Sequence, residues 1–320
     1  MLKAVIPQKV TSRLLFVFSF AAIIITLAGI FIYRVLEDKT RHEVYGELST
    51  LAQFKIREVI NWRQERINDA NFIFKNAEFK RLVSEFFSKP SNLKAKERVA
   101  QYIRSLKENH EYIDIILVDL SGKKYPLFSN SAEQIQGVNE EYFTKAIKEK
   151  KVLLTDLNRD SSVSGTRIHL SSIIPIFSSK NNSLICAVEI IIDPTKLLFP
   201  IIKMISDRHK TCEFFLVRRD KDSVLFLNDL RYIKNSALNF RQPLTKKDLP
   251  AAMAVLGKTG IFEGRDYRGI PVIADLRKIS DSPWFLISKI DKDELYSPLQ
   301  FQSAIITVFV IILILLCGIG

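Results

Sequence analysis

The chain has 320 residues, which allows about two ordinary domains, and 47% of them are hydrophobic. This composition excludes an intrinsically disordered chain as a general description. The formal net charge of +12 is compatible with nucleic-acid binding in a cytosolic protein. The net charge does not indicate nucleic-acid binding if the basic residues lie outside the cytoplasm, which the next segments predict.

Two long apolar runs lie near the ends of the chain. Leu14–Tyr33, LLFVFSFAAIIITLAGIFIY, contains no charged residue, and Ala304–Gly320, AIITVFVIILILLCGIG, extends to the last residue. About 20 apolar residues, at roughly 1.5 Å rise each, cross a bilayer core of about 30 Å. We therefore predict transmembrane helices over 14–34 and 302–320. A cleaved signal peptide is the alternative for the first run, but the run is longer than usual and no A-x-A site follows it.

The charges around the first run predict its orientation. Lys3, Lys9 and Arg13 precede it without an acidic residue, whereas the segment after it mixes both signs. The positive-inside rule places residues 1–13 in the cytoplasm and the segment between the two runs outside it. We then expect no nucleic-acid partner, because membrane lipid or an acidic ligand accounts for the outward basic residues. Since no basic segment closes the second run, we expect an N-terminal part of a longer protein; a complete two-span protein is the alternative.

The segment after the first run predicts two helices over 37–109. From Glu37 to Phe87 there is no proline, and apolar residues recur at three- and four-residue steps. This spacing predicts one long amphipathic helix that continues out of the membrane. The sequence Ser88-Lys-Pro-Ser91 is expected to end it, and a second helix follows over 93–109. The apolar stripe of the long helix would face water in a single copy, so we expect a homodimer.

Two α+β units are predicted next, over 110–193 and 194–297, and each has a hairpin, a short helix and three strands in that order. In the first unit these are IDIILVDL with KKYPLF, then EEYFTKAIKEK, then VLLTDL, TRIHLSSIIPIF and LICAVEIII. A connecting helix, DPTKLLFPIIKMI, begins with Asp as cap and Pro at the first position. The second unit has FFLVRRDKDSVLFLN, LPAAMAVLGK, GIFEGRDY, IPVIADLRKI and SPWFLISKI. The repeated order indicates a duplicated unit.

This plan resembles the double Cache, or tandem PAS-like, extracytoplasmic sensor region of bacterial transmembrane receptors. The resemblance covers residues 14–320. It is carried by INWRQERINDANFI (60–73), RIHLSSIIPI (167–176), FLVRRDKDSVLFLNDLR (215–231) and LPAAMAVLGKTGIFEGRDYRGIPVIADLRKISDSPWFLISKIDKDELYSPL (249–299). It implies an α+β fold with a membrane-distal and a membrane-proximal Cache module behind one long helix, flanked by two transmembrane helices in the bacterial inner membrane.

The quoted segments are most similar to the N-terminal part of PAS-containing sensor histidine kinases. That resemblance implies a ligand-sensing and signalling region whose catalytic output domain, with its response regulator, lies beyond these residues. Related regions also precede diguanylate cyclases and chemotaxis signalling domains, and a binding or scaffold module that senses no small molecule is a further alternative. Amino-acid-binding members carry Arg and Trp just before a Tyr. Here GVNEEYF keeps Tyr142 but has Asn139, Glu140 and Glu141 before it, which argues against amino-acid sensing.

Polar residues in the strands of the first unit are candidate ligand contacts. Alternation places Arg167, His169 and Ser171 on one face of TRIHLSSIIPI, where an arginine can pair with an anionic group; a solvated edge strand is the alternative. Asp156 and Glu189 are carboxylates among apolar residues, and each needs a partner or a pocket. For Asp156, an ion pair with Arg167 is the alternative. We predict a polar or anionic small-molecule ligand at Tyr142, Asp156, Arg167, His169, Ser171 and Glu189.

The second unit offers secondary candidates. Asp266, Tyr267 and Arg268 lie between two glycines, and we interpret them as turn residues that also qualify for a proximal pocket. There is no G-x-S-x-G, no phosphate-binding glycine loop and no histidine-kinase phosphoacceptor or ATP-binding segment. The three cysteines and four histidines show no metal-ligand spacing. We therefore expect no catalytic residue, no metal and no cofactor within these residues.

Overall fold

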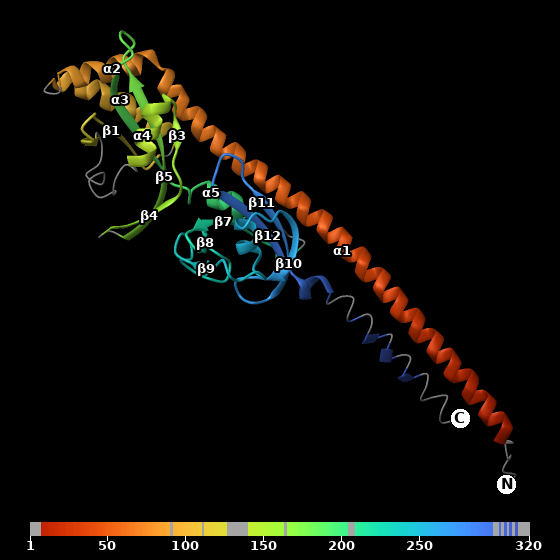
Figure 1. Ribbon diagram of the computed structural model, residues 1–320. Helices are drawn as coiled ribbons and strands as arrows, with labels where there is room; N and C mark the ends of the chain where they lie inside the picture. The colour runs from red at the N-terminus through yellow and green to blue at the C-terminus, as the bar shows by residue number, and fades with distance from the viewer. Residues whose placement is uncertain are drawn as a thin grey trace.

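The computed structural model describes residues 8–89, 92–110, 112–126, 140–162, 165–203 and 209–296, with 301, 304–305, 307–308 and 311–312. A long helix runs beside two antiparallel sheets, one formed by each half of the chain (Figure 1). The predicted α+β class is confirmed. Most of the predicted membrane span over 302–320 lies outside the described residues, as do residues 1–7 of the predicted cytoplasmic segment.

Helix α1 extends without interruption over Gln8–Lys75. It ends earlier than the predicted break at Ser88–Ser91, because Asn76 takes an extended conformation, with ψ of 111°. The Asn76 side chain accepts a hydrogen bond from the Phe79 amide at 2.8 Å and so begins a separate helix, α2 (Ala77–Ser88). Helix α3 (Leu93–His110) follows, close to its predicted bounds. No helix within the described part of the chain combines the length and hydropathy that crossing a membrane requires.

The N-terminal sheet has six strands in the order β2-β1-β6-β5-β3, and β4 pairs with the free part of β5. Its elements are β1 (Asp114–Val118), β2 (Lys124–Pro126), α4 (Glu140–Glu149), β3 (Leu153–Leu154), β4 (Asn158–Ser162), β5 (Gly165–Phe177) and β6 (Leu184–Ile192). The predicted hairpin is present, and Gly122 supplies the positive φ of its turn. Strand β4, NRDSS, was not predicted, because its sequence has none of the apolar alternation that marks a strand.

The C-terminal sheet also has six strands, in the order β10-β11-β12-β7-β8-β9. Its elements are α5 (Leu198–Lys203), β7 (Glu213–Asp220), β8 (Ser223–Phe226), β9 (Arg241–Pro243), α6 (Pro250–Val255), β10 (Gly260–Arg265), β11 (Pro271–Lys278) and β12 (Trp284–Asp291). The connecting helix begins at Leu198, not at Pro194 with Asp193 as its cap, as predicted. The Asp193 carboxylate instead accepts bonds from the amide and hydroxyl of Thr195 and closes a turn.

The two sheets share one strand order. Each places the first strand of its hairpin beside the last strand of its unit, so that β2-β1-β6-β5-β3 corresponds to β8-β7-β12-β11-β10. The same arrangement therefore occurs twice along the chain, as the repeated order of elements in the sequence predicted. In both sheets the last strand lies at the centre, between the hairpin and the remaining strands.

The apolar stripe of α1 is buried within the same chain. Val44, Leu48, Val59 and Trp62 belong to one core cluster that includes residues of both sheets, α2 and α3. The other face of the C-terminal sheet packs on α6, through residues such as Phe215 and Ile287. Exposure of this stripe was the reason for expecting a homodimer, and that reason does not hold, because the sheets of the same chain cover it.

Candidate functional site

The face of the N-terminal sheet that lies under α4 is only partly apolar. Ile116, Val118 and Ile191 form a small buried cluster there, with Phe143 of α4 packed on it. In the strand register Glu189 lies opposite Ile116 of β1 and Ser171 lies opposite Ile191 of β6. Residues directly opposite in neighbouring strands point to the same side of a sheet. Glu189 and Ser171 therefore share this face with the apolar cluster.

Glu189 is a buried carboxyl group in the middle of β6. Its side chain accepts a 2.8 Å hydrogen bond from the Ser171 hydroxyl, and both residues are buried. Burial raises the pKa of Glu189, and neither this hydrogen bond nor the charge of Lys124 offsets it. A carboxyl group of this kind can pair with a hydrogen-bond donor or a positive charge, which makes Glu189 a candidate ligand contact.

His169 lies two residues before Ser171 on the same face of β5. It is 5% exposed, and its Nδ1 atom lies 3.5 Å from a carboxylate oxygen of Asp160 on β4. Neither of these two buried atoms makes a hydrogen bond. Burial lowers the pKa of His169, which favours the neutral ring, although the Asp160 charge opposes this effect. Arg167, at the end of the same stripe, has an exposed side chain.

Asp156 does not join this face. It lies between β3 and β4 and accepts a 2.7 Å hydrogen bond from the Trp284 indole nitrogen, together with a short bond from Arg218 Nη1. Both partners belong to the C-terminal sheet, so the alternative ion pair with Arg167 is replaced by one with Arg218. Tyr142 of α4 is affected by the same charge: burial raises its pKa, and Asp156 raises it further. The predicted site is thus divided between the sheet face and the junction of the two sheets.

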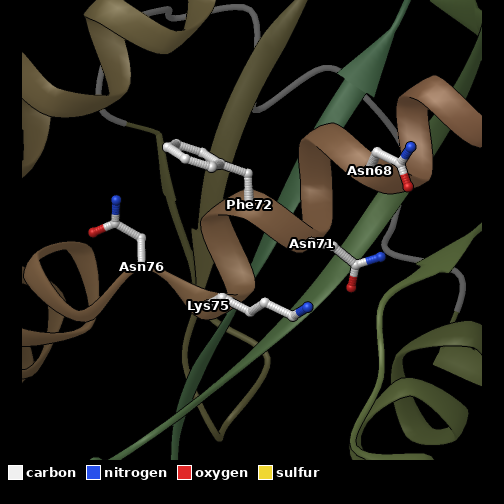
Figure 2. Close-up of a pocket in the computed structure, with 5 residues that line it drawn as sticks. All are labelled: Asn68, Asn71, Phe72, Lys75 and Asn76. Carbon is white, nitrogen blue, oxygen red and sulfur yellow. The ribbon is translucent and has the colours of Figure 1, made fainter.

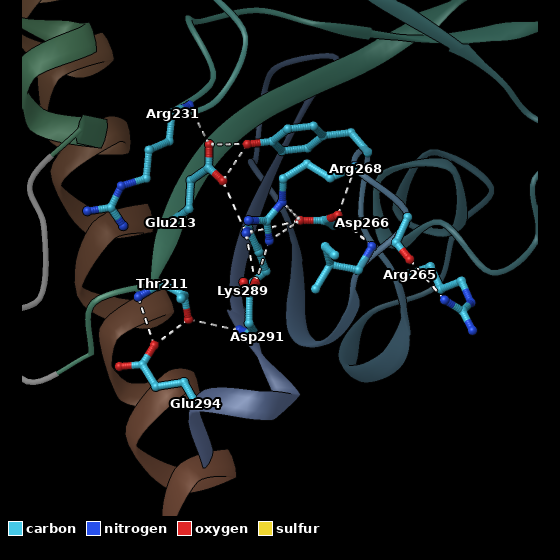
Figure 3. A network of polar contacts seen from close by, with 12 residues as sticks. Thr211, Glu213, Arg231, Arg265, Asp266, Arg268, Lys289, Asp291 and Glu294 are labelled. Atoms are coloured by element: carbon cyan, nitrogen blue, oxygen red, sulfur yellow. Dashed lines mark hydrogen bonds and ion pairs between the residues drawn. The ribbon is translucent and has the colours of Figure 1, made fainter. Parts of the chain in front are cut away.

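The corresponding face of the C-terminal sheet is closed by charged side chains of the chain itself (Figure 3). The ammonium of Lys289 is fully buried and lies 3.3 Å from Glu213, 3.1 Å from Asp266 and 3.2 Å from Asp291. Arg268 pairs with Asp266 and Asp291, at 2.6 and 2.5 Å. The positive groups lower the pKa of Asp266 although burial alone would raise it. The cluster therefore favours the ionised form of Asp266.

The secondary candidates Asp266, Tyr267 and Arg268 all belong to this cluster. Asp266 accepts bonds from the amides of Arg268 and Ile270, so it does form the predicted turn. The Tyr267 hydroxyl donates to Glu213 at 2.8 Å. Sequence reasoning missed Lys289 and Glu213. Both are charged residues within apolar strands, in ISKI and CEFF, which is the same signal that identified Glu189.

Glu189 and Lys289 occupy equivalent places in the two sheets. Each lies in the central last strand, opposite the first strand of the hairpin, where Glu189 faces Ile116 and Lys289 faces Glu213. In the C-terminal sheet three carboxylates surround the charged group at this place. In the N-terminal sheet the Ser171 hydroxyl and the apolar cluster of Ile116, Val118 and Ile191 share the face with Glu189. The N-terminal face is therefore the better candidate for an external ligand.

Neither of two further grooves borders Glu189, but one of them borders the charged cluster of the C-terminal sheet. One, of about 410 Å³, borders Glu213 and Arg231, and exposed lysines line its rim. The other, of about 480 Å³, lies where α1 ends and is lined by Asn68, Asn71, Phe72, Lys75 and Asn76 (Figure 2). Its Asn76 oxygen is used to cap α2. Among the residues that the structure describes, no group of histidine, cysteine and acidic side chains is arranged to hold a metal ion.

No protein-family model matches the sequence, and no curated protein sequence matches it either. Solved structures do match. The ligand-binding domain of the Pseudomonas fluorescens chemoreceptor CtaA, with L-serine, is 14% identical at a TM-score of 0.51, over 79% of this chain and 99% of that one. The ligand-binding domain of Pseudomonas aeruginosa PctB, with L-Arg, is 14% identical at a TM-score of 0.53, and the match covers 81% of this chain and 92% of that one. The sensory domain of Campylobacter jejuni Tlp3, with isoleucine bound, is 11% identical at a TM-score of 0.55, and the match covers 81% of this chain and 97% of that one.

At this level of identity the similarity establishes the fold. The chain has the fold of the ligand-binding domains of bacterial chemoreceptors, which confirms the resemblance to a Cache sensor region inferred from the sequence, and the more specific resemblance to histidine kinases stays a prediction.

Proposed function

We propose that this chain, which has the fold of bacterial receptor sensor domains, is the ligand-sensing and signalling region of such a receptor. The observation that carries the proposal is the buried Glu189–Ser171 pair on a sheet face under α4. Burying a carboxyl group lowers the stability of the fold, and buried groups with a shifted pKa are found preferentially at functional sites. Within a fold whose solved examples bind small molecules, ligand recognition is that purpose.

The proposed ligand is a small polar molecule bound over β5 and β6. Glu189, Ser171 and His169 would contact it directly, since their side chains share one face of the sheet. An anionic group on the ligand would be oriented toward the exposed guanidinium of Arg167. Tyr142 and Asp156 would lie at the edge of this site, toward the C-terminal sheet. The ligands named for the structural neighbours are amino acids, but the Arg expected for them before Tyr142 is replaced here by Glu140 and its neighbours.

The signal would reach the cell through membrane anchors over 14–34 and 302–320 in a bacterial inner membrane. Ligand binding moves an equilibrium between two packings only if the ligand binds them unequally, typically by about 1–3 kcal/mol. The quoted sequence segments favour a sensor histidine kinase acting on a response regulator. The structural neighbours favour a chemoreceptor at least as well. Sequencing the gene past Gly320 tests these outputs: a kinase, a cyclase or a chemotaxis signalling domain would identify the output, and a stop codon would favour the scaffold alternative.

A homodimer remains part of the proposal, on a different surface from the one expected. Phe54 and Phe72 of α1 are 53% and 64% exposed. They are separated by about five helical turns and so lie on one side of the helix. Between them the exposed side chains include Asn61, Glu65 and Asn68. The two asparagine amides can pair with their own copies, and Glu65 pairs with Arg66 of its own chain at 3.7 Å. A second copy packed in parallel along this face would cover both aromatic rings.

A ligand screen on the whole chain in lipid nanodiscs tests the proposal. Amino acids, organic acids, amines and purines would be added while thermal unfolding is followed. A ligand at 100 times its dissociation constant adds about 2.7 kcal/mol to stability. We expect a hit whose stabilisation is lost in Glu189→Gln and Ser171→Ala but kept in Ser172→Ala, a buried neighbour on the opposite face. A hit that all three variants retain would place the site elsewhere, and no hit at all would favour the scaffold alternative.

A further inference from the structure

We propose that Asp156 is a coupling residue, which links the Glu189 face to the strand that leads out of the C-terminal sheet. The inference rests on the proposed function, because it assigns the route by which occupancy of that site is communicated. Its basis is a series of hydrogen bonds and contacts between buried and half-buried groups. The series begins at Glu189, crosses from one sheet to the other at Asp156, and ends on α1 and β12.

The first part of the route joins Glu189 to the segment that carries Asp156. The Ser171 hydroxyl donates to Glu189 at 2.8 Å. The Ser171 amide donates to the Thr155 hydroxyl oxygen at 2.8 Å, and the Thr155 amide returns a bond to the Ser171 carbonyl at 2.8 Å. Thr155 is 3% exposed, so these bonds are shielded from water. A displacement of Ser171 would therefore displace Thr155 and, with it, the next residue.

The second part crosses between the sheets. Asp156 divides its carboxylate between two residues of the C-terminal sheet: the Trp284 indole donates to Oδ1, and Arg218 donates to Oδ2. The Leu157 amide also donates to Oδ1, at 2.7 Å, which fixes the side chain relative to its own backbone. Bonds to a charged acceptor are stronger and more directional than neutral ones. A rotation of this segment would therefore change the bonds to Trp284 and Arg218.

The third part reaches the elements next to the predicted membrane anchors. Trp284 is fully buried, and the Arg63 guanidinium of α1 lies 4.6 Å from its ring centre. Arg63 also donates to the Asp281 carbonyl at 2.9 Å, just before β12. At the far end of β12 the Asp291 amide donates to the Thr211 hydroxyl at 3.1 Å, next to the helical turn at 292–296. The Trp284 side chain of β12 thus contacts Arg63 of α1 as well as Asp156.

The test uses the two tryptophans of the chain as reporters. The whole protein in nanodiscs would be labelled with 5-fluorotryptophan, and the Trp284 resonance would be assigned by its persistence in Trp62→Phe. We expect Ser171→Ala to shift the Trp284 resonance, and Thr155→Val to shift it in the same way. Ser172→Ala replaces the adjacent buried serine on the opposite face of β5 and should leave the resonance in place. Glu189→Gln gives a second perturbation of the same face should Ser171→Ala not fold.

An unchanged Trp284 resonance in Ser171→Ala and Glu189→Gln, with a shift in Asp156→Asn, would overturn the coupling. An equal shift in Ser172→Ala would overturn it too, since the effect would then not follow the bonds described. These measurements need no ligand, so a failed ligand screen does not decide them. Conversely, a ligand that binds through Glu189 and leaves the Trp284 resonance unmoved would support the proposed function and refute the coupling.

Discussion

At the scale of single residues, charged groups in apolar strands are the informative feature of this sequence. Glu189, Lys289 and Glu213 all stand out in this way, and the structure gives them different surroundings. Lys289 pairs with three carboxylates, two of which, Asp266 and Asp291, also pair with Arg268. Glu189 is bonded to a hydroxyl. Residue type alone does not separate a closed structural cluster from a site that can receive a ligand.

The raised pKa of Glu189 predicts a pH-dependent cost in stability. Because its folded-state pKa lies above the unfolded value, its contribution is favourable below about pH 4 and is lost as the pH rises through the folded-state pKa. We therefore expect Glu189→Gln to be more stable than the natural protein at pH 7 and equally stable near pH 4. Urea unfolding across this pH range measures the difference.

The control for this prediction is Glu65→Gln, at an exposed position of α1. It should give no pH-dependent gain. If Glu189→Gln were less stable than the natural protein at pH 7, the carboxylate would be contributing to the fold, and the interpretation of Glu189 as a ligand-site residue would be wrong.

At the scale of elements, local chemistry decided several boundaries that periodicity did not. The apolar spacing continues through Asn76, yet α1 ends there because the asparagine side chain bonds the Phe79 amide. Asp193 closes a turn with Thr195 and so delays α5. Strand β4 exists because β5 is longer than its partners in the main sheet and pairs along its free part, from Gly165 to His169. Each of these outcomes depends on a hydrogen bond that hydrophobic spacing does not encode.

The exposed face of α1 predicts a specific crosslink. In a parallel homodimer along Phe54 and Phe72, the two copies of Asn68 would face one another. We expect Asn68→Cys, in a Cys317→Ser background, to form an intermolecular disulfide in the membrane under mild oxidation. Cys186 and Cys212 are buried and should not compete. Non-reducing gel electrophoresis provides the measurement.

Lys96→Cys serves as the matched control, because Lys96 is exposed on α3 and not on α1. Equal crosslinking at both positions would indicate random collision, and crosslinking at Lys96 alone would place the dimer contact on another element.

At the scale of the whole molecule, one helix spans both sheets and joins them. The N-terminal part of α1 and the described residues that follow β12 extend in the same direction, away from the N-terminal sheet (Figure 1). Near that end, Arg41 of α1 bonds the Tyr296 hydroxyl at 3.4 Å and pairs with Glu263 at 3.6 Å. Glu263 also pairs with Lys292 at 2.5 Å. Helix α1 and the segment after β12 are thus held together by these contacts.

The proposed topology predicts the sides of the membrane that two lysines occupy. In a Cys317→Ser background, Lys221→Cys lies in the exposed turn between β7 and β8 and should react with a membrane-impermeant maleimide on spheroplasts. Lys3→Cys should react only after the membrane is permeabilised, because the positive-inside rule places it in the cytoplasm. Reaction of both cysteines under the same condition would show that the two residues share one side, and the two-anchor arrangement would then be wrong.

The sequence by itself determined the α+β class, the repeated order of strands and the resemblance to receptor sensor domains. These follow from periodicity and local motifs, which a single chain displays directly. Only the tertiary structure decided that the apolar stripe of α1 is covered by its own sheets, that Asp156 bonds Arg218 and Trp284, and that Lys289 closes the second sheet face. Such facts depend on which distant residues meet, since the partner of a buried charge is set by strand order and register and leaves no mark in the local sequence.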